Sequence, residues 1–158
     1  MKFSTKLLAM ISAVAMLAAC ETAPKDGGRV NSDGRTAPHD GSQRDLEVNI
    51  GDRVFFDLDS SVINSEGEAT LQRQAEWMKK NKNVKVTVEG HCDERGTREY
   101  NLALGERRAT AVKSYLTNLG VASSRVSTIS YGKERPAVAE SDDSAWSQNR
   151  RGVTVVSN

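Results

Sequence analysis

The chain has 158 residues, so a leader and a linker at its start would leave room for one domain of roughly 110 residues. Lysine and arginine total 22, aspartate and glutamate total 21, and the two signs are mixed along the chain. A net charge of +1 without a basic run excludes nucleic acid as an expected partner.

The first 19 residues predict a cleaved signal peptide. Two lysines precede an apolar run of about 13 residues at Leu7–Ala19, which has the length of a signal-peptide core and is too short to span a bilayer. The run ends in Leu17-Ala18-Ala19-Cys20, which resembles a bacterial lipobox. That resemblance implies that lipid is attached to Cys20 and that residues 1–19 are removed.

A lipidated Cys20 predicts a protein that is anchored in the outer membrane with its domain in the periplasm. Several acyl chains on one cysteine hold a protein stably, whereas a single chain binds only marginally. Glu21 follows the cysteine, and the absence of an aspartate there favours the outer membrane over the inner one. The alternative is an ordinary secreted protein whose cysteine happens to follow a cleavage site.

Residues 20–49 predict a flexible tether, and residues 50–158 predict the domain. The tether is rich in Gly, Asp, Arg, Ser and Pro and has too few apolar residues to stay ordered. A coil of about 25 such residues averages roughly 28 Å end to end and extends to about 85 Å.

The domain begins with a predicted strand at Arg53–Phe56 and a predicted helix after it. Ser65 and Glu68 have the spacing of a capping box, and the helix is expected to end by Asn81. Its expected apolar face consists of Leu71, Ala75 and Met78.

The cleanest strand signal follows, because valines alternate with polar residues over Val84–Glu89. A loop over 90–97 then leads into a helix predicted for Arg98–Leu119, with Gly120 as its terminator. Weaker strand signals and one short helical turn complete the domain, at Val126–Tyr131, Ser144–Gln148 and Val153–Val156.

The order strand, helix, strand, helix, strand, strand predicts the α+β class. We expect a two-layer sandwich in which two helices pack on one face of a small mixed sheet.

The motifs with the highest information content surround the loop before the long helix. They read Glu-Gly-His-Cys-Asp-Glu-Arg-Gly-Thr over 89–97, Glu-Tyr-Asn over 99–101 and Leu-Gly-Glu-Arg-Arg-Ala over 104–109. Phe-Asp-Leu-Asp at 56–59, the segment 130–137 and Asn-Arg-Arg at 149–151 add to them. With these spacings, about Asp52 to Val156 resembles the OmpA C-terminal-like family, and within it the peptidoglycan-associated lipoproteins (Pal) of the Tol-Pal system.

The resemblance implies a non-catalytic protein that binds the diaminopimelate of the peptidoglycan stem. Matched by position, the family's aspartate falls on Asp93 and its arginine on Arg108. The carboxylate of Asp93 would accept from the ligand's ammonium, while the planar guanidinium of Arg108 would hold its carboxylate with two parallel hydrogen bonds.

Four further residues are expected at this site, and Asn101 is expected beside it. Leu104 lies four residues before Arg108, so it shares a helix face with the guanidinium and can form an apolar wall beside it. The resemblance implies contributions from Leu58 and Asp59, the latter largely through its backbone. Thr97 is expected to cap the long helix, and Asn101 to brace the loop.

The resemblance also implies partners. These are peptidoglycan, the membrane through the lipid, and the Tol proteins TolB and TolA, in a system that maintains the envelope and constricts the outer membrane at cell division. No cofactor is implied.

The matched region departs from the family pattern at three positions, and the roles of several residues in it stay open. Cys92, Leu58 and Arg98 stand where the family commonly has a small residue, an aromatic residue and proline. The redox state of Cys92 stays open, and so do the roles of four arginines, Arg95, Arg107, Arg150 and Arg151.

Other functions are weighed against this one. Asp93 and Arg108 could form a simple surface ion pair, worth at most about 1 kcal/mol. His91 and Cys92 suggest a metal site or a thiol enzyme, but the other histidine, His39, lies in the predicted tether, and a zinc site needs three or four ligands. We therefore expect neither a metal nor enzyme activity. An assembly factor whose main ligand is a protein remains a third possibility.

Overall fold

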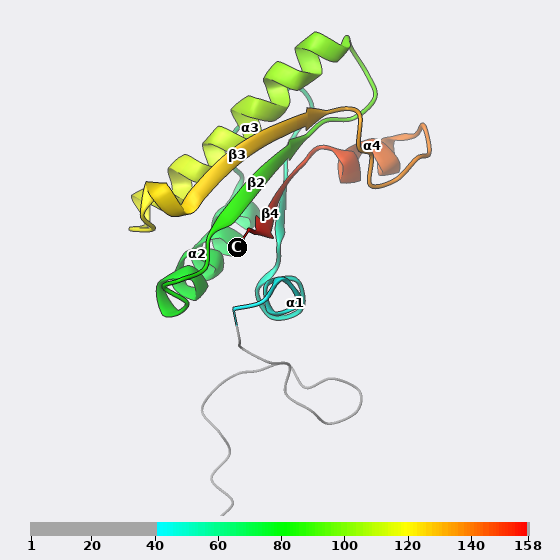
Figure 1. The fold of residues 1–158 in the computed structure, drawn as a ribbon. Helices are drawn as coiled ribbons and strands as arrows, with labels where there is room; N and C mark the ends of the chain where they lie inside the picture. The colour runs from blue at the N-terminus through cyan, green and yellow to red at the C-terminus, as the bar shows by residue number, and fades with distance from the viewer. Residues whose placement is uncertain (1–40, 158) are drawn as a thin grey trace, which may run out of the picture.

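The computed structural model describes residues 41–157, and within them it has two layers (Figure 1). One layer is a four-stranded sheet with the order β1-β4-β2-β3, and the other consists of the helices α2 and α3 on one of its faces. Strand β2 is parallel to β3 and antiparallel to β4, which is antiparallel to β1. The predicted α+β class and mixed sheet are confirmed. The predicted signal peptide, Cys20 and residues 21–40 lie outside the described residues.

The predicted elements occur in the predicted order. The strands are β1 (Arg53–Phe55), β2 (Val86–His91), β3 (Val126–Gly132) and β4 (Arg151–Val156). The helices are α1 (Gln43–Asp45), the π-helical η1 (Leu46–Ile50), α2 (Ser65–Lys80), α3 (Arg98–Asn118), the 3-10 turn η2 (Ser123–Arg125) and α4 (Asp143–Asn149). Strand β2 continues past the predicted end to His91, and β4 begins two residues early, so both strands reach further toward the α4 end of the sheet.

The start of α2 differs from the predicted capping box. Asn64 is the N-cap, and its side-chain oxygen accepts from the backbone N–H of Gly67 at 2.9 Å. Ser65 is already the first helical residue. The sequence has an amide and a hydroxyl side by side, and both residue types are good caps.

The folded domain begins earlier than the predicted boundary at residue 50. Residues 43–50 form α1 and η1, and the side chain of Leu46 is fully buried in the core. The buried carboxylate of Asp45 accepts from Trp77 Nε1 at 2.6 Å and from Asn49 Nδ2 at 2.8 Å. The assignment of residues 41–49 to the tether was therefore wrong. These residues are mostly polar, but they include the apolar anchor Leu46 and the buried acceptor Asp45, which bonds to Trp77 on the distant α2.

Two glycines allow α3 to lie directly on β2. A Cβ atom built on Gly90 would be 1.8 Å from the carbonyl oxygen of Gly105, so the two backbones touch where any side chain would separate them. Further along α3 the contact continues through apolar side chains, which are Ala109, Val112 and Leu116. This close approach places the first turns of α3 over the end of β2.

The two ends of the domain carry different features. Helix α1 lies at one end, whereas the loop between β2 and α3 lies with α4 at the opposite end (Figure 1). The described residues therefore begin near the end of the domain away from that loop. Among residues 41–157, no helix has the length and apolar character to cross a bilayer.

We predict that Leu46→Ala destabilises the domain by about 2 to 5 kcal/mol, because it leaves a cavity where a fully buried side chain was. Urea denaturation of the purified chain that starts at residue 21 measures this. Val48→Ala is the matched control, since Val48 lies in the same segment but is exposed, and it should cost less than about 0.5 kcal/mol. Equal effects of the two changes would show that the segment is not part of the core.

Candidate functional site

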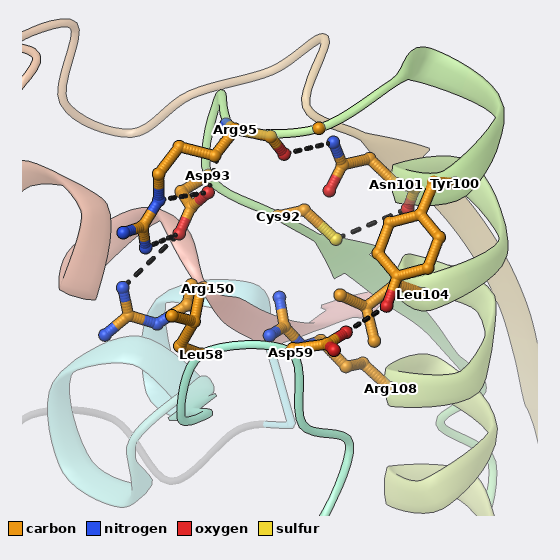
Figure 2. A pocket seen from close by; sticks show the side chains of 11 residues that line it. Leu58, Asp59, Cys92, Asp93, Arg95, Tyr100, Asn101, Leu104, Arg108 and Arg150 are labelled. Carbon is orange, nitrogen blue, oxygen red and sulfur yellow. Dashed lines mark hydrogen bonds and ion pairs between the residues drawn. The ribbon is translucent and has the colours of Figure 1, made fainter.

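A cavity of about 280 Å³ lies at the end of the sheet where α3 begins (Figure 2). Its walls come from the β1–α2 connection, the β2–α3 loop, the first turns of α3 and the residue after α4. The lining residues are Leu58, Asp59, Cys92, Asp93, Arg95, Gly96, Tyr100, Asn101, Leu104, Arg108 and Arg150. Five of the six residues predicted for the site thus line one cavity.

Thr97 is the predicted residue that does not line this cavity. It is the N-cap of α3, and its hydroxyl accepts from the backbone N–H of Tyr100 at 3.2 Å. Asn101 braces the same loop, because its Nδ2 donates to the carbonyls of Arg95 and Thr97 at 2.7 and 3.0 Å. The predicted structural roles of Thr97 and Asn101 are confirmed.

Arg108 is a fully buried cation on α3. Its guanidinium donates to three backbone carbonyls, those of Ser60, His91 and Asp57, at 2.8, 2.8 and 3.0 Å. Burial lowers its pKa, but an arginine remains charged at any physiological pH. A guanidinium has five N–H donors, so these bonds use three of them, and the guanidinium also interacts with the Cys92 side chain beside it.

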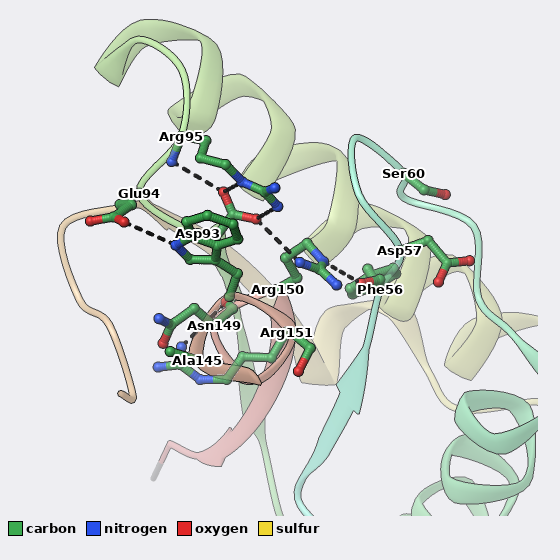
Figure 3. Close-up of polar contacts among 12 residues, drawn as sticks. Phe56, Asp57, Ser60, Asp93, Glu94, Arg95, Ala145, Asn149, Arg150 and Arg151 are labelled. Carbon is green, nitrogen blue, oxygen red and sulfur yellow. Dashed lines mark hydrogen bonds and ion pairs between the residues drawn. The ribbon is translucent and has the colours of Figure 1, made fainter. Parts of the chain in front are cut away.

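Asp93 follows β2, and its carboxylate is only 4% exposed. Its Oδ1 accepts from the backbone N–H and the Nε of Arg95 at 3.1 and 3.2 Å. Its Oδ2 accepts from Arg95 Nη2 at 2.6 Å and from Arg150 Nη1 at 3.3 Å (Figure 3). Burial alone would raise the pKa of Asp93, but these hydrogen bonds and the charge of Arg95 hold it below the usual range.

Asp93 and Arg108 therefore lie on one cavity, as expected, but neither is an isolated charge. From the sequence we expected Asp93 and Arg108 to bind the ligand and named no protein partner for either at the site. In the structure Arg108 binds backbone carbonyls, and Asp93 binds two arginines. The alternative of a simple ion pair between the two is wrong, because each has its bonds with other groups.

Two of the four unassigned arginines thus contact Asp93. Arg150 also donates through Nε to the carbonyl of Phe56 at 3.0 Å, which joins the end of β1 to the cavity. Arg95 stacks on the ring of Trp146, with 4.2 Å from its guanidinium carbon to the ring centroid. Arg151 is a structural residue, because it is buried and donates to the carbonyls of Asn149 and Arg135.

Tyr100 is a cavity residue that sequence reasoning missed. Its hydroxyl donates to the Asp59 carboxylate across the mouth of the cavity, and this bond raises the pKa of the phenol (Figure 2). Asp59 has a φ of 54°, a left-handed conformation that is uncommon outside glycine. The spacing of Tyr100, Leu104 and Arg108 at four-residue intervals was the signal that places all three on one helix face.

The apolar part of the cavity comes from three side chains. Leu104 is buried beside Arg108, as predicted, and Leu58 is 60% exposed at the mouth. Cys92 is buried, and its thiol donates to the carbonyl of Asn101 at 3.3 Å. Burial raises the pKa of Cys92, so the thiol form dominates at neutral pH.

His91 lies next to the site but does not line the cavity. Its ring is buried near Tyr131, with 5.6 Å between ring centroids, and its Nε2 is 3.4 Å from the Glu89 carboxylate. Burial and the charges of Arg151 and Arg135 lower its pKa to about 4. Among residues 41–157, no three His, Cys, Asp or Glu side chains are placed to hold a metal.

Comparison with known proteins yields one family. The model of the OmpA family matches residues 55–150. The peptidoglycan-associated lipoprotein of Mesorhizobium japonicum is 54% identical over 152 residues, covering 94% of this chain and 90% of that protein. The peptidoglycan-associated lipoprotein of Pasteurella multocida is 44% identical and covers 97% and 98%.

Solved structures agree with the sequence comparison. The peptidoglycan-associated lipoprotein from Burkholderia pseudomallei superposes with a TM-score of 0.66 and 40% identity, over 67% of this chain and 90% of that one. The C-terminal domain of Helicobacter pylori MotB gives a TM-score of 0.63 and 26% identity, over 68% and 84%.

We predict that His91 makes stability depend on pH between about 4 and 6.5. The unfolded chain takes up a proton below about 6.5, whereas the native ring stays neutral to about 4. The contribution of His91 to the free energy of unfolding is therefore complete above pH 6.5 and decreases as the pH falls. By about pH 4 the loss amounts to about 3 kcal/mol. Urea denaturation of wild type and His91→Gln across this range measures it, and equal slopes for the two would contradict the assignment.

We also predict that Cys92 reacts slowly with iodoacetamide in the native chain, because its thiol is buried and its pKa is raised. The chain that starts at residue 21 has no other cysteine. Alkylation followed by mass spectrometry should be slow in buffer at pH 8 and fast in urea. Equal rates would mean that the site opens readily.

Proposed function

The chain belongs to the OmpA family, and from that membership we propose that it is an outer-membrane lipoprotein that binds peptidoglycan non-covalently. Its ligand would be the diaminopimelate of the peptide stem. The domain would tether the outer membrane to the cell wall as part of the Tol-Pal system, with TolB and TolA as protein partners. The relatives are named peptidoglycan-associated lipoproteins, which supports peptidoglycan as the ligand and a lipid on the chain.

One observation carries the proposal. A buried carboxylate, Asp93, and a buried guanidinium, Arg108, line the same cavity of about 280 Å³. When it is not cross-linked, the diaminopimelate side chain of the stem ends in a carbon that carries both an ammonium and a carboxylate. A ligand of that kind needs an acceptor and a two-pronged donor a short distance apart, and these two side chains supply them.

The remaining cavity residues support a ligand with an alkyl chain between its charged end and its peptide. Leu104 and Cys92 provide an apolar wall deep in the cavity, and Leu58 extends it to the mouth. The three carbonyls leave part of the Arg108 guanidinium for a ligand carboxylate, which would meet it beside the Cys92 side chain.

The position of the cavity supports a role as a tether. Helix α1, near the start of the described residues, lies at the end opposite to the β2–α3 loop (Figure 1). With lipid on Cys20, we propose that residues 21–40 are the tether. This tether is shorter than the one expected from the sequence, which extended to residue 49. Twenty residues of coil would average roughly 25 Å and extend to about 70 Å.

The proposed role includes no bond-breaking step. Within the described residues, the thiol of Cys92 is buried and donates to a carbonyl, while the neighbouring His91 does not line the cavity and has its ring near Tyr131. A thiol enzyme needs a base within hydrogen-bond reach of its nucleophile. The arrangement thus favours a binding protein over a hydrolase.

We predict that Asp93→Asn and Arg108→Lys each weaken binding to purified peptidoglycan sacculi by about 10- to 100-fold. Each loses a charge-assisted contact worth roughly 1.5 to 3 kcal/mol. Co-sedimentation of the purified chain with sacculi over a concentration series gives the affinity. These changes are milder than truncation to alanine, because Asp93 and Arg108 also hold the loops around them.

Glu99→Gln and Arg98→Lys are matched controls, since both residues are exposed on α3 and neither lines the cavity. Thermal unfolding of all variants separates lost binding from lost structure. If folded Asp93→Asn and Arg108→Lys pellet as well as the controls, the cavity is not the peptidoglycan site.

A further inference from the structure

The carboxylate of Asp93 has no acceptor position left for a ligand. An ionised carboxylate offers about four acceptor positions, two on each oxygen. In the structure Oδ1 accepts two hydrogen bonds from Arg95, and Oδ2 accepts one from Arg95 and one from Arg150. An ammonium can therefore bind Asp93 only by displacing one of these arginine side chains.

Arg150 is the less mobile of the two. Its side chain is 16% exposed, and its Nε donates to the carbonyl of Phe56 at the end of β1 (Figure 3). Removing Arg150 from Asp93 would also disturb that bond. Its contact with Asp93 is the longer one, at 3.3 Å, but its position is set by the strand and not by the carboxylate.

Arg95 is the side chain that can leave. It is 36% exposed and comes from the loop itself. Its backbone N–H bond to Asp93 and its carbonyl bond to Asn101 do not involve its side chain, so the loop stays closed when the guanidinium moves.

In the same placement, the Arg95 guanidinium has favourable contacts that do not depend on Asp93. The ring of Trp146 lies under it at 4.2 Å, and Trp146 is itself held by Glu94, which accepts from its Nε1 at 2.9 Å. The charges of Asp143 and Glu94 also act on Arg95. Arg95 can release Asp93 and keep the aromatic ring and two other carboxylates near it.

We propose that Arg95 is an internal competitor for the ligand ammonium at Asp93, and that binding exchanges one cation for the other. This inference rests on the proposed function, because it concerns the ammonium of the same ligand. It makes Arg95 a specificity-determining residue. A charged amine can replace a guanidinium on a carboxylate, whereas an amide nitrogen offers too weak a bond to do so.

The test compares Arg95→Met with Arg98→Met. Methionine removes the charge and the donors of Arg95 but retains an unbranched side chain that can pack against Trp146. Arg98 is three residues away and 74% exposed, and it pairs with Glu134 at 3.4 Å without contacting Asp93. Arg98→Met therefore loses the same charge and one ion pair, and it reports any general effect of removing a positive charge near the cavity.

Calorimetric titration with the soluble stem tripeptide, which carries a free ammonium on diaminopimelate, gives the affinity. We expect Arg95→Met to bind about 3- to 10-fold more tightly than wild type, and Arg98→Met to bind as wild type does. Arg95→Lys, which retains the charge without the planar fork, should fall between wild type and Arg95→Met. The tripeptide acetylated on that nitrogen should bind weakly to all of them and show no gain.

Weaker or unchanged binding by Arg95→Met would overturn the proposal, since Arg95 would then be a ligand contact or a bystander. An equal gain in Arg98→Met would also overturn it, because net charge alone would explain the effect. Asp93→Asn separates this inference from the function on which it rests. If Asp93→Asn binds the tripeptide as wild type does, the proposed function fails, whatever Arg95 does.

Discussion

The three hydrogen bonds from the buried guanidinium of Arg108 hold the site together. They join α3 to the carbonyl of His91 at the end of β2 and to the carbonyls of Asp57 and Ser60 in the β1–α2 connection. A buried cation without such partners would cost several kcal/mol, so these carbonyls are needed to keep it inside the domain. The walls of the cavity are therefore positioned by the same group that, on the proposed function, binds the ligand.

A second set of bonds centres on Asp93 and brings the last part of the chain to the cavity. Arg150, between α4 and β4, contacts Asp93 from one side, and Arg95 contacts it from the other. The cavity lining thus has three arginines and two aspartates, and most of their charge is balanced within the protein. A ligand enters a network that is already complete, so its affinity depends on which internal bonds it replaces as well as on those it adds.

Sequence reasoning brought together five residues that line one cavity, but not the bonds between them. Spacing placed Leu104 and Arg108 on one helix face, and resemblance placed Asp93 in the loop before that helix. Neither shows that Arg150, 57 positions after Asp93, donates to the same carboxylate. Tyr100 had the right spacing, but its partner Asp59 lies 41 positions earlier in the chain. Such pairs depend on chain segments that approach one another only after folding.

The sequence by itself determined the local structure of this domain. Alternating valines produce β2, apolar residues at helical spacing produce α2 and α3, and Thr97 and Gly120 bound α3, because each signal depends on neighbours within a few residues. Only the tertiary structure decided that Leu46 and Asp45 belong to the fold, since their partners lie on α2. It also decided which cations surround Asp93, because hydrogen bonds between distant segments depend on how the sheet and helices pack.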